Sequence, residues 1–148
     1  MSFPSWTHTA HHDVYPYTHP SRPELSSKGK VVIVTGSGRG IGRATALAFA
    51  KSGARAVIIT SRSENAMATV ANEITKLGCE ARYYSADAVD QTRIQEVFTA
   101  TKAKSGSIDV VVDNVGYLPD EALIKDARLD DWCDAFEVNT KGGFIAIV

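Results

Sequence analysis

Four glycines alternate with other residues in one short segment of this chain: Gly36, Gly38, Gly40 and Gly42. They follow the apolar run 31–35, which is typical of a strand buried on both faces, and they precede a run with helical periodicity. Glycine at such a junction permits a tight turn and lets backbone N–H groups approach an anion without interference from a Cβ atom. The segment therefore predicts a pyrophosphate-binding loop at the positive end of the following helix. A plain strand-to-helix turn, in which the glycines serve packing alone, is the alternative.

The spacing of these glycines distinguishes between two patterns. G-x-G-x-x-G does not fit, because its last position falls on Ile41 or on Arg43, depending on which glycine begins it. T-G-x-x-x-G-x-G fits, with Thr35, Gly36, Gly40 and Gly42. In this pattern we expect the first glycine to form the turn, the second to face the phosphates and the third to let helix and strand pack closely.

These residues need a scaffold, and from residue 28 onward the chain alternates strand and helix signals. Strands are predicted at 31–35, 56–60, 81–86 and 108–113. The first helix is predicted at about 40–52, before a left-handed Gly53, and the second between a Ser63 cap and Gly78. The third carries the stripe Ile94, Val97, Phe98 and Thr101 and ends near Gly106. The fourth begins at about Asp131, after an Asp130 cap, and continues to the end. On the last helix, one face is expected to carry Trp132, Phe136, Asn139 and Gly143. This order predicts an α/β fold with a doubly wound parallel sheet.

Composition narrows the class of protein. The 148 residues are 44% hydrophobic and 22% charged, with a formal net charge of −1, as in an ordinary globular domain. A net charge so close to zero does not indicate the basic surface that is typical of nucleic-acid-binding proteins. No run approaches the ~18 apolar residues of a membrane span, and the start lacks the pattern of a signal peptide. Cys79 and Cys133 stand isolated, which fits a reducing compartment. We therefore predict a cytoplasmic protein with no nucleic-acid or membrane partner.

Residues 1–27 differ from the rest and are predicted to form an extended amino-terminal arm. They hold all four histidines and four of the five prolines, and prolines at 16, 20 and 23 prevent a long helix. His8 and His12 stand four residues apart beside His11, a spacing that suits a zinc site only on a helix. A polar arm without a metal site is therefore the prediction.

At four places the chain resembles the short-chain dehydrogenases/reductases. The matching segments are TGSGRGIG (35–42), SADAVD around Asp87, DNVG (113–116) and WCDAFEVNTKG (132–142), and their order and spacing are those of the family. The segment SRPELSSKGK is similar to fungal members. The resemblance covers about residues 28–148. It implies a Rossmann-type domain with strand order 3-2-1-4, incomplete relative to the whole family fold, that binds a nicotinamide cofactor.

The resemblance also implies which residues meet that cofactor: Gly36, Ser37, Arg39, Gly40, Ile41, Gly42, Ser61, Arg62, Asp87, Ala88, Asn114 and Gly116. The family's aspartate and the next backbone N–H hold the adenine. The DNVG segment departs from the family's N-N-A-G at Asp113 and Val115, and the bulk of Val115 is expected near the ribose. For Asn114, a turn residue without a ligand contact is the alternative.

The end of the second strand bears on the choice of cofactor. A site selective for NAD places a carboxylate there for the ribose 2′-OH, and this chain has no acid before Glu64. Arg62 is positioned to meet a 2′-phosphate, with Ser61 as a hydrogen-bond partner and Arg39 as a second cation. NADP is therefore predicted over NAD. Solvated surface charges are the alternative for both arginines.

The family's catalytic Ser and Tyr-x-x-x-Lys are absent from these residues, because no tyrosine has a lysine four positions later. By resemblance, the backbone carbonyl of Asn139 holds a water of the proton relay; a buried polar helix residue is the alternative. We expect the chain to be the amino-terminal part of an oxidoreductase acting on small carbonyl or alcohol substrates. A short nucleotide-binding protein without turnover is the second hypothesis, and a purely structural α/β domain is the third. The last strand forms an apolar sheet edge, which predicts self-association.

Overall fold

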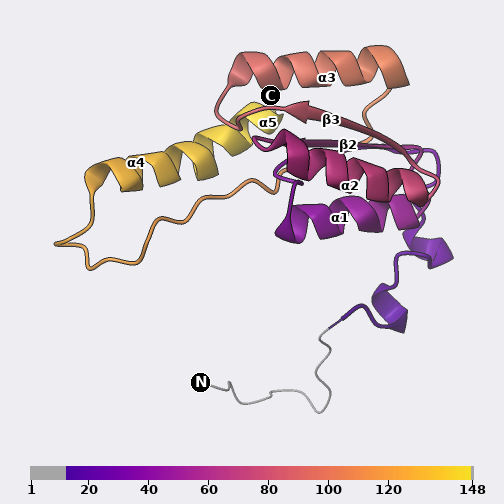
Figure 1. The fold of residues 1–148 in the computed structure, drawn as a ribbon, viewed down its shortest axis with the longest axis horizontal. Coiled ribbons are helices and arrows are strands. Elements are labelled where there is room, and N and C mark those ends of the chain that lie inside the picture. Colours follow the sequence, from indigo (N-terminus) through magenta and orange to yellow (C-terminus); the bar gives the residue numbers. More distant parts are fainter. Residues whose placement is uncertain (1–12, 148) are drawn as a thin grey trace.

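The computed structural model describes residues 13–147 and places four parallel strands in one sheet (Figure 1). The strands are β1 (Val31–Val34), β2 (Ala56–Ser61), β3 (Glu80–Ser85) and β4 (Val110–Val112), in the order β3-β2-β1-β4. The connecting helices are α1 (Gly40–Lys51), α2 (Glu64–Lys76) and α3 (Gln91–Ser105). A last helical segment consists of α4 (Leu129–Phe136), the π-helix η3 (Glu137–Gly142) and α5 (Gly143–Ile147). The predicted fold class and strand order are confirmed.

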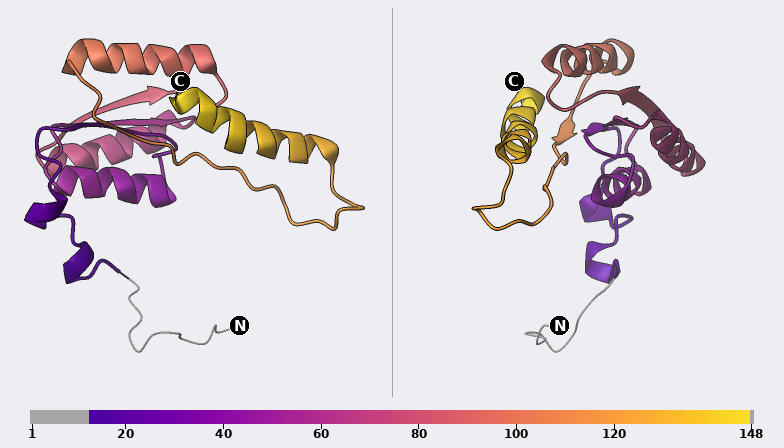
Figure 2. Two further views of the ribbon diagram at one scale, coloured as in Figure 1. Left: turned by 180° about the vertical axis from the view of Figure 1, so that it is seen from behind. Right: turned by 60° about the vertical axis from the view of Figure 1, so that its left-hand side comes forward.

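Helices cover both faces of the two central strands. All of β1 and nearly all of β2 are buried, which explains why each strand is a continuous apolar run in the sequence. One core cluster joins these strands to α1 and α2, and a second lies on the opposite face with α3 and α5 (Figure 2). The predicted apolar stripe of α2 is buried in the first cluster: Met67, Val70, Ala71 and Ile74.

Glycines end the three connecting helices as predicted. Gly53, Gly78 and Gly106 have φ of 90°, 81° and 78°, in the left-handed region that favours glycine. At the start of α3, the Asp90 side chain accepts a hydrogen bond from the backbone N–H of Arg93 at 3.0 Å. Ser63 occupies the cap position of α2 as predicted, but its side chain makes no capping hydrogen bond.

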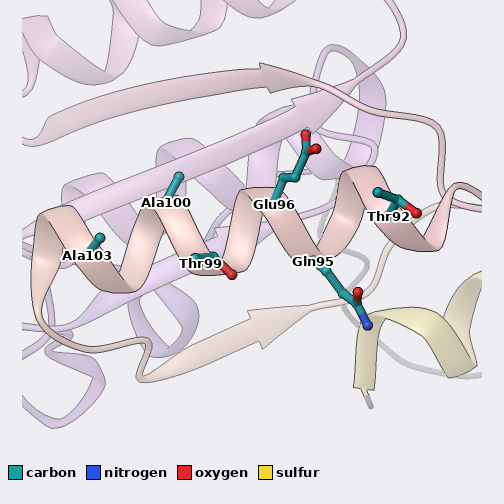
Figure 3. Close-up of a pocket in the computed structure, with 6 residues that line it drawn as sticks. All are labelled: Thr92, Gln95, Glu96, Thr99, Ala100 and Ala103. Atoms are coloured by element: carbon teal, nitrogen blue, oxygen red, sulfur yellow. The ribbon is translucent and has the colours of Figure 1, made fainter.

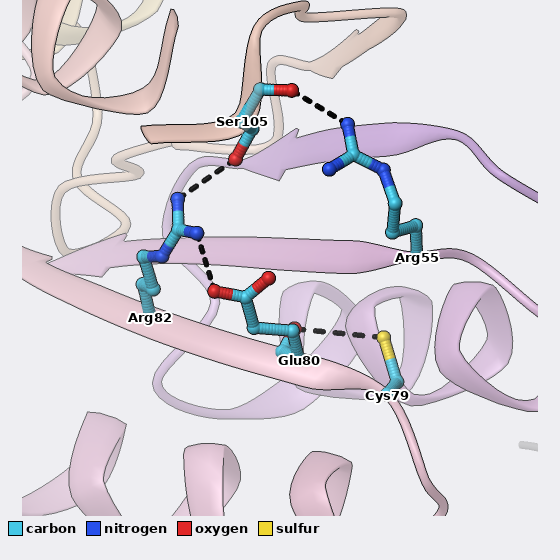
Figure 4. Close-up of polar contacts among 5 residues, drawn as sticks. All are labelled: Arg55, Cys79, Glu80, Arg82 and Ser105. Carbon is cyan, nitrogen blue, oxygen red and sulfur yellow. Dashed lines mark hydrogen bonds and ion pairs between the residues drawn. The ribbon is translucent and has the colours of Figure 1, made fainter. Parts of the chain in front are cut away.

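A polar cluster fixes the end of α3 against Arg55, which precedes β2, and against the first residues of β3 (Figure 4). Nη2 of Arg55 donates to the carbonyl oxygen of Ser105 at 2.6 Å, and Nη1 of Arg82 donates to its Oγ at 2.7 Å. Arg82 also pairs with Glu80. Two guanidinium groups thus lie at the negative end of the helix dipole, where cations are stabilising. Next to Glu80, burial raises the pKa of the Cys79 thiol.

β4 is shorter than predicted because a side chain replaces part of its ladder. The backbone N–H of Asp109 donates to the carbonyl oxygen of Val31 at 2.9 Å, and the N–H of Val31 donates to the Asp109 carboxylate at 2.8 Å. The hydrogen bond from Val31 lowers the pKa of this carboxyl group. The ladder therefore begins at Val110 instead of residue 108. On its other side β4 has no partner strand among residues 13–147.

The last helical segment differs most from the sequence prediction. Arg128, not Asp130, occupies the cap position, and Asp130 lies in the first turn. α4 projects away from the sheet and has no buried residue, whereas α5 buries Ala146 (Figure 1). Trp132 and Phe136 share a face as predicted, with stacked rings 5.8 Å apart. The regular helix predicted to the end is interrupted because η3 changes the hydrogen-bond register.

The described part of the amino-terminal arm, residues 13–27, is only partly extended. It holds two short 3-10 helices, η1 (Pro16–Thr18) and η2 (Pro23–Leu25), which begin at prolines because proline suits a first helical position. Neither has a buried residue. The N–H of Ser27 donates to the carbonyl oxygen of Ser52 at 2.9 Å and attaches the arm to the end of α1. His8, His11 and His12, and the metal site considered for them, lie outside the described residues.

Candidate functional site

The glycine-rich loop leaves the start of α1 open. Gly36 and Gly40 have φ of 62° and 57°, a conformation that side-chain-bearing residues rarely adopt. A Cβ atom at Gly40 has no neighbouring atom within 4 Å. Arg39 occupies the cap position without a side-chain hydrogen bond to the helix, and the first turn of α1 contains no acid. The positive end of this helix is thus not compensated by a side chain of its own first turn.

Gly42 has a different role, because it lies against the loop itself. A Cβ atom at this position falls 2.5 Å from the carbonyl oxygen of Gly36 and 2.5 Å from Nδ2 of Asn114. Close packing therefore explains Gly42, although its nearest neighbours are the glycine-rich loop and Asn114 and not the strand. It does not explain Gly40, which faces open space.

Thr35 ties the loop that follows β4 to the glycine-rich loop. Its Oγ1 accepts hydrogen bonds from the backbone N–H groups of Asn114 at 3.0 Å and Val115 at 3.3 Å. The same hydroxyl donates to the Asp113 carboxylate at 3.0 Å. Nδ2 of Asn114 donates to the carbonyl oxygens of Thr35 at 3.0 Å and Gly36 at 3.3 Å. The predicted site residues of the two loops are therefore brought together. Thr35 belongs to the glycine pattern, but its residue type alone does not indicate this role.

Ser37 is placed differently from the other loop residues. Its side chain is fully buried, and its Oγ donates to the carbonyl oxygen of Val34 at 2.8 Å and accepts from the N–H of Thr60 at 3.2 Å. This hydroxyl links the ends of β1 and β2 and is fully engaged with the protein. Ile41, in contrast, is 79% exposed at the start of α1.

The two predicted cationic residues lie on neighbouring loops. Arg39 and Arg62 are exposed, and neither side chain makes an ion pair within the described part of the chain. Between them the loops touch, because a Cβ atom at Gly38 falls 2.9 Å from Oγ of Ser61. Ser61 is occupied in its own turn, where its Oγ accepts from the N–H of Ser63 at 3.1 Å. Both guanidinium groups are thus available to an anion.

Asp87 and Ala88 form the turn after β3. Oδ1 of Asp87 accepts from the N–H of Val89 at 3.2 Å, and its carbonyl oxygen accepts from Asp90 at 3.2 Å. Ala88 lies against the last helical segment, since a Cβ atom at Gly142 falls 3.3 Å from its Cβ. This turn therefore lies at the same carboxyl-terminal edge of the sheet as the glycine loop.

Asn139 lies in the π-helix η3 and anchors the loop that follows β4. Its Nδ2 donates to the carbonyl oxygen of Tyr117 at 2.7 Å, and its Oδ1 accepts from the N–H of Tyr117 at 2.8 Å. Gly116 is adjacent, because its Cβ position lies 3.6 Å from Oδ1 of Asn139. Asn139 is exposed, so the alternative of a buried polar residue is wrong. The loop 113–117 is held at one end by Thr35 and at the other by Asn139.

One surface hollow lies away from these loops. It has a volume of about 390 Å³ and is lined by α3 alone, through Thr92, Gln95, Glu96, Thr99, Ala100 and Ala103 (Figure 3). No second element contributes a converging polar group, so it does not resemble a ligand site. Among residues 13–147 there is no cluster of metal-ligating side chains, and no helix is long and apolar enough to cross a membrane.

The chain is similar to known proteins in sequence and in fold. A family model described as short chain dehydrogenase matches residues 30–148. The short chain dehydrogenase pigC of Monascus ruber is 32% identical over 146 residues, covering 94% of this chain and 47% of that protein. A solved structure of NAD⁺-bound xylitol dehydrogenase superposes with a TM-score of 0.79 at 30% identity, over 82% of this chain and 46% of that one. An actinorhodin polyketide ketoreductase solved with NADPH superposes with a TM-score of 0.75 at 29% identity, over 80% of this chain and 45% of that one.

The chain thus spans about half the length of the relatives that it matches. The family match covers nearly all residues from the first strand onward. It includes the glycine loop, the turn after β3, the loop after β4 and the helix that carries Asn139. The chain therefore belongs to the short chain dehydrogenase family.

Proposed function

We propose that this chain is the NADP(H)-binding part of an oxidoreductase that transfers a hydride between the cofactor and a small carbonyl or alcohol compound. The observation that carries the proposal is the start of α1: an exposed helix end, two left-handed glycines and open space at Gly40. A pyrophosphate fits such a site because it accepts hydrogen bonds from free N–H groups and is favoured by the helix dipole. When bound, the nicotinamide group supplies or accepts the hydride.

The protein's own residues would hold the rest of the cofactor around this point. The turn at Asp87 and Ala88 would hold the adenine, and the loop with Asn114 and Gly116 would lie along the ribose of the nicotinamide. Support comes from the contacts that bring these loops to one edge of the sheet, from Thr35 on one side and Asn139 on the other. The backbone carbonyl of Asn139 is proposed to hold a water of the proton relay.

Preference for NADP over NAD rests on charge at the end of β2. The structure shows exposed guanidinium groups at positions 39 and 62 on loops that touch, and the turn 61–63 contains no carboxylate. A charge-assisted hydrogen bond from arginine to a phosphate contributes about 1.5–3 kcal/mol. A tenfold difference in Kd corresponds to about 1.4 kcal/mol of binding free energy. One such contact would therefore favour NADP over NAD by about tenfold or more.

The test compares affinities for NADP⁺ and NAD⁺ by calorimetry on the 148-residue chain. Arg62→Asp is expected to reverse the preference, since it removes the phosphate contact and adds a carboxylate for the ribose hydroxyls. Lys125→Asp is the matched control, because it makes the same charge change at a side chain that is 74% exposed on a distant loop. Equal affinities before and after Arg62→Asp contradict the proposed preference.

A nucleotide-binding protein without turnover is the second candidate. Incubation of the chain with NADPH and a panel of carbonyl compounds tests it. Nicotinamide absorbance is expected to stay constant, and turnover that persists in a rigorously purified sample contradicts the expectation.

Self-association and a cytoplasmic location complete the proposal. Support for self-association comes from β4, which pairs only with β1 and leaves Val111 38% exposed. Support for the location comes from two unpaired cysteines, Cys79 and Cys133. Fractionation of cells that express a tagged chain tests the location, and recovery in a secreted fraction contradicts it.

A further inference from the structure

Gly38 is the one glycine of the loop that the binding pattern does not require. In T-G-x-x-x-G-x-G it occupies a free position. Its backbone does not require glycine either, because the positive φ values of this loop belong to Gly36 and Gly40 alone. Any residue could adopt the conformation at this position, so the reason for glycine must lie in the space around it.

That space is filled by the turn after β2. A Cβ atom at Gly38 falls 2.9 Å from Oγ of Ser61 and 3.3 Å from Cβ of Ala66. Ser61 cannot easily move aside, because its Oγ accepts from the N–H of Ser63 at 3.1 Å and donates to the carbonyl oxygen of Ser63 at 3.3 Å. The serine hydroxyl is thus fixed by its own turn and acts as a spacer against the glycine loop.

Each residue of this contact is followed directly by an arginine. Arg39 follows Gly38, and Arg62 lies within the turn that Ser61 and Ser63 close. The separation of the two guanidinium groups therefore depends on how closely the two loops approach. Hydrogen bonds to a phosphate tolerate only about 0.5 Å of variation in length, so the approach of the two loops limits the positions at which both arginines can reach one phosphate.

We infer that Gly38 and Ser61 form a spacing pair that positions Arg39 and Arg62 for one phosphomonoester, the 2′-phosphate of the adenosine ribose. Gly38 is then a positioning residue for cofactor selectivity and not a contact residue. The inference rests on the proposed NADP(H) site. It predicts that a methyl group at position 38 separates the loops and weakens the binding of a ligand with a 2′-phosphate, while a ligand without it is unaffected.

Calorimetry with NADP⁺ and NAD⁺ on the 148-residue chain tests the inference through a double-mutant cycle. Gly38→Ala is expected to weaken NADP⁺ binding by about tenfold and to change NAD⁺ binding by less than about twofold. Ser61→Ala alone is the reference for the double variant, because it lacks both the Oγ atom of the clash and any hydrogen bond from this hydroxyl to the phosphate. Adding Gly38→Ala to Ser61→Ala is expected to change NADP⁺ affinity by less than about twofold. Gly38→Ala combined with Ala66→Gly is the matched control; it relieves only the weaker contact and is expected to recover little.

The outcomes separate this inference from the function on which it rests. Equal affinity of the unmodified chain for NADP⁺ and NAD⁺ refutes the proposed preference and overturns the spacing pair with it. A preference that Gly38→Ala leaves intact overturns the spacing pair alone. If Gly38→Ala does not fold, the double variant is compared with Ser61→Ala alone: a folded double variant with the same preference supports the pair, and any other result overturns it.

Discussion

Replacing Gly42 by alanine tests whether close packing holds the glycine loop in place. A Cβ atom at this position lies 2.5 Å from the carbonyl oxygen of Gly36, 2.5 Å from Nδ2 of Asn114 and 2.9 Å from Cα of Ser37. Two of these three atoms belong to the backbone, so rotation of a side chain cannot relieve the clash. The start of α1 and the glycine loop must move apart.

Three contributions determine the expected change in the free energy of unfolding. Overpacking costs about 1–3 kcal/mol. Displacing the Asn114 amide from the carbonyl oxygens of Thr35 and Gly36 costs about 1 kcal/mol for each hydrogen bond that is lost. Alanine has a higher helix propensity than glycine, which offsets up to about 1 kcal/mol of this loss. The expected destabilisation by Gly42→Ala is therefore about 2–4 kcal/mol.

Urea unfolding followed by far-UV circular dichroism measures this change. Gly142→Ala is the matched control, because the three atoms nearest its Cβ position all belong to Ala88 and the closest lies at 3.3 Å. Its effect is expected to stay below about 1 kcal/mol. If Gly42→Ala is as stable as the unmodified chain or more stable, helix propensity dominates and the packing argument is refuted.

Other contacts are tested by three further substitutions. Asp109→Asn is expected to make the free energy of unfolding less sensitive to acid. The hydrogen bond from Val31 lowers the folded-state pKa of the Asp109 carboxyl group. The ionised group therefore stabilises the fold above its unfolded-state pKa of about 3.9, and this stabilisation is lost as pH falls through the folded-state pKa. Unfolding curves recorded below about pH 5 measure how steeply the free energy of unfolding falls with pH. The same steepness in Asp109→Asn and in the unmodified chain contradicts this role of Asp109. Asn139→Ala removes both bonds to Tyr117 and is expected to speed amide exchange at 114–117 while β1 stays protected; equal exchange in that loop contradicts the anchor. Val111→Lys is expected to reduce the sedimentation coefficient of the associated chain, with Val14→Lys as control at another exposed valine; an unmodified chain that is monomeric at every concentration contradicts self-association.

The parts of the fold that sequence predicted well are those with an unambiguous burial pattern. β1 and β2 are covered on both faces, so their apolar runs gave their bounds to within one residue. The bounds of β4 were wrong because the Asp109 side chain, and not its backbone, completes the bonding with Val31. A sequence pattern reports which residues prefer burial, and it does not report which atom of a residue makes a hydrogen bond.

The candidate site was predictable in its location but not in its internal contacts. Glycines that follow a strand indicated the turn and the open helix end. The buried hydroxyl of Ser37 and the hydrogen bonds of Thr35 depend on strands that are distant in sequence, and neither residue type indicates them. The contribution of each residue to cofactor binding stays a prediction.

The π-helix η3 joins a projecting helix to one that packs on the core, and this has a consequence for insertions and deletions. One residue of an α-helix corresponds to a rotation of about 100° about its axis. Deleting a single residue such as Thr140 would convert the π turn to an α turn and turn the stacked pair Trp132 and Phe136 by about that angle relative to Ala146, which stays buried. The same deletion would carry Asn139 away from Tyr117. In this family member the length of one helical turn therefore decides both the direction of an aromatic surface and the anchoring of a loop, and a one-residue change there would alter the two together.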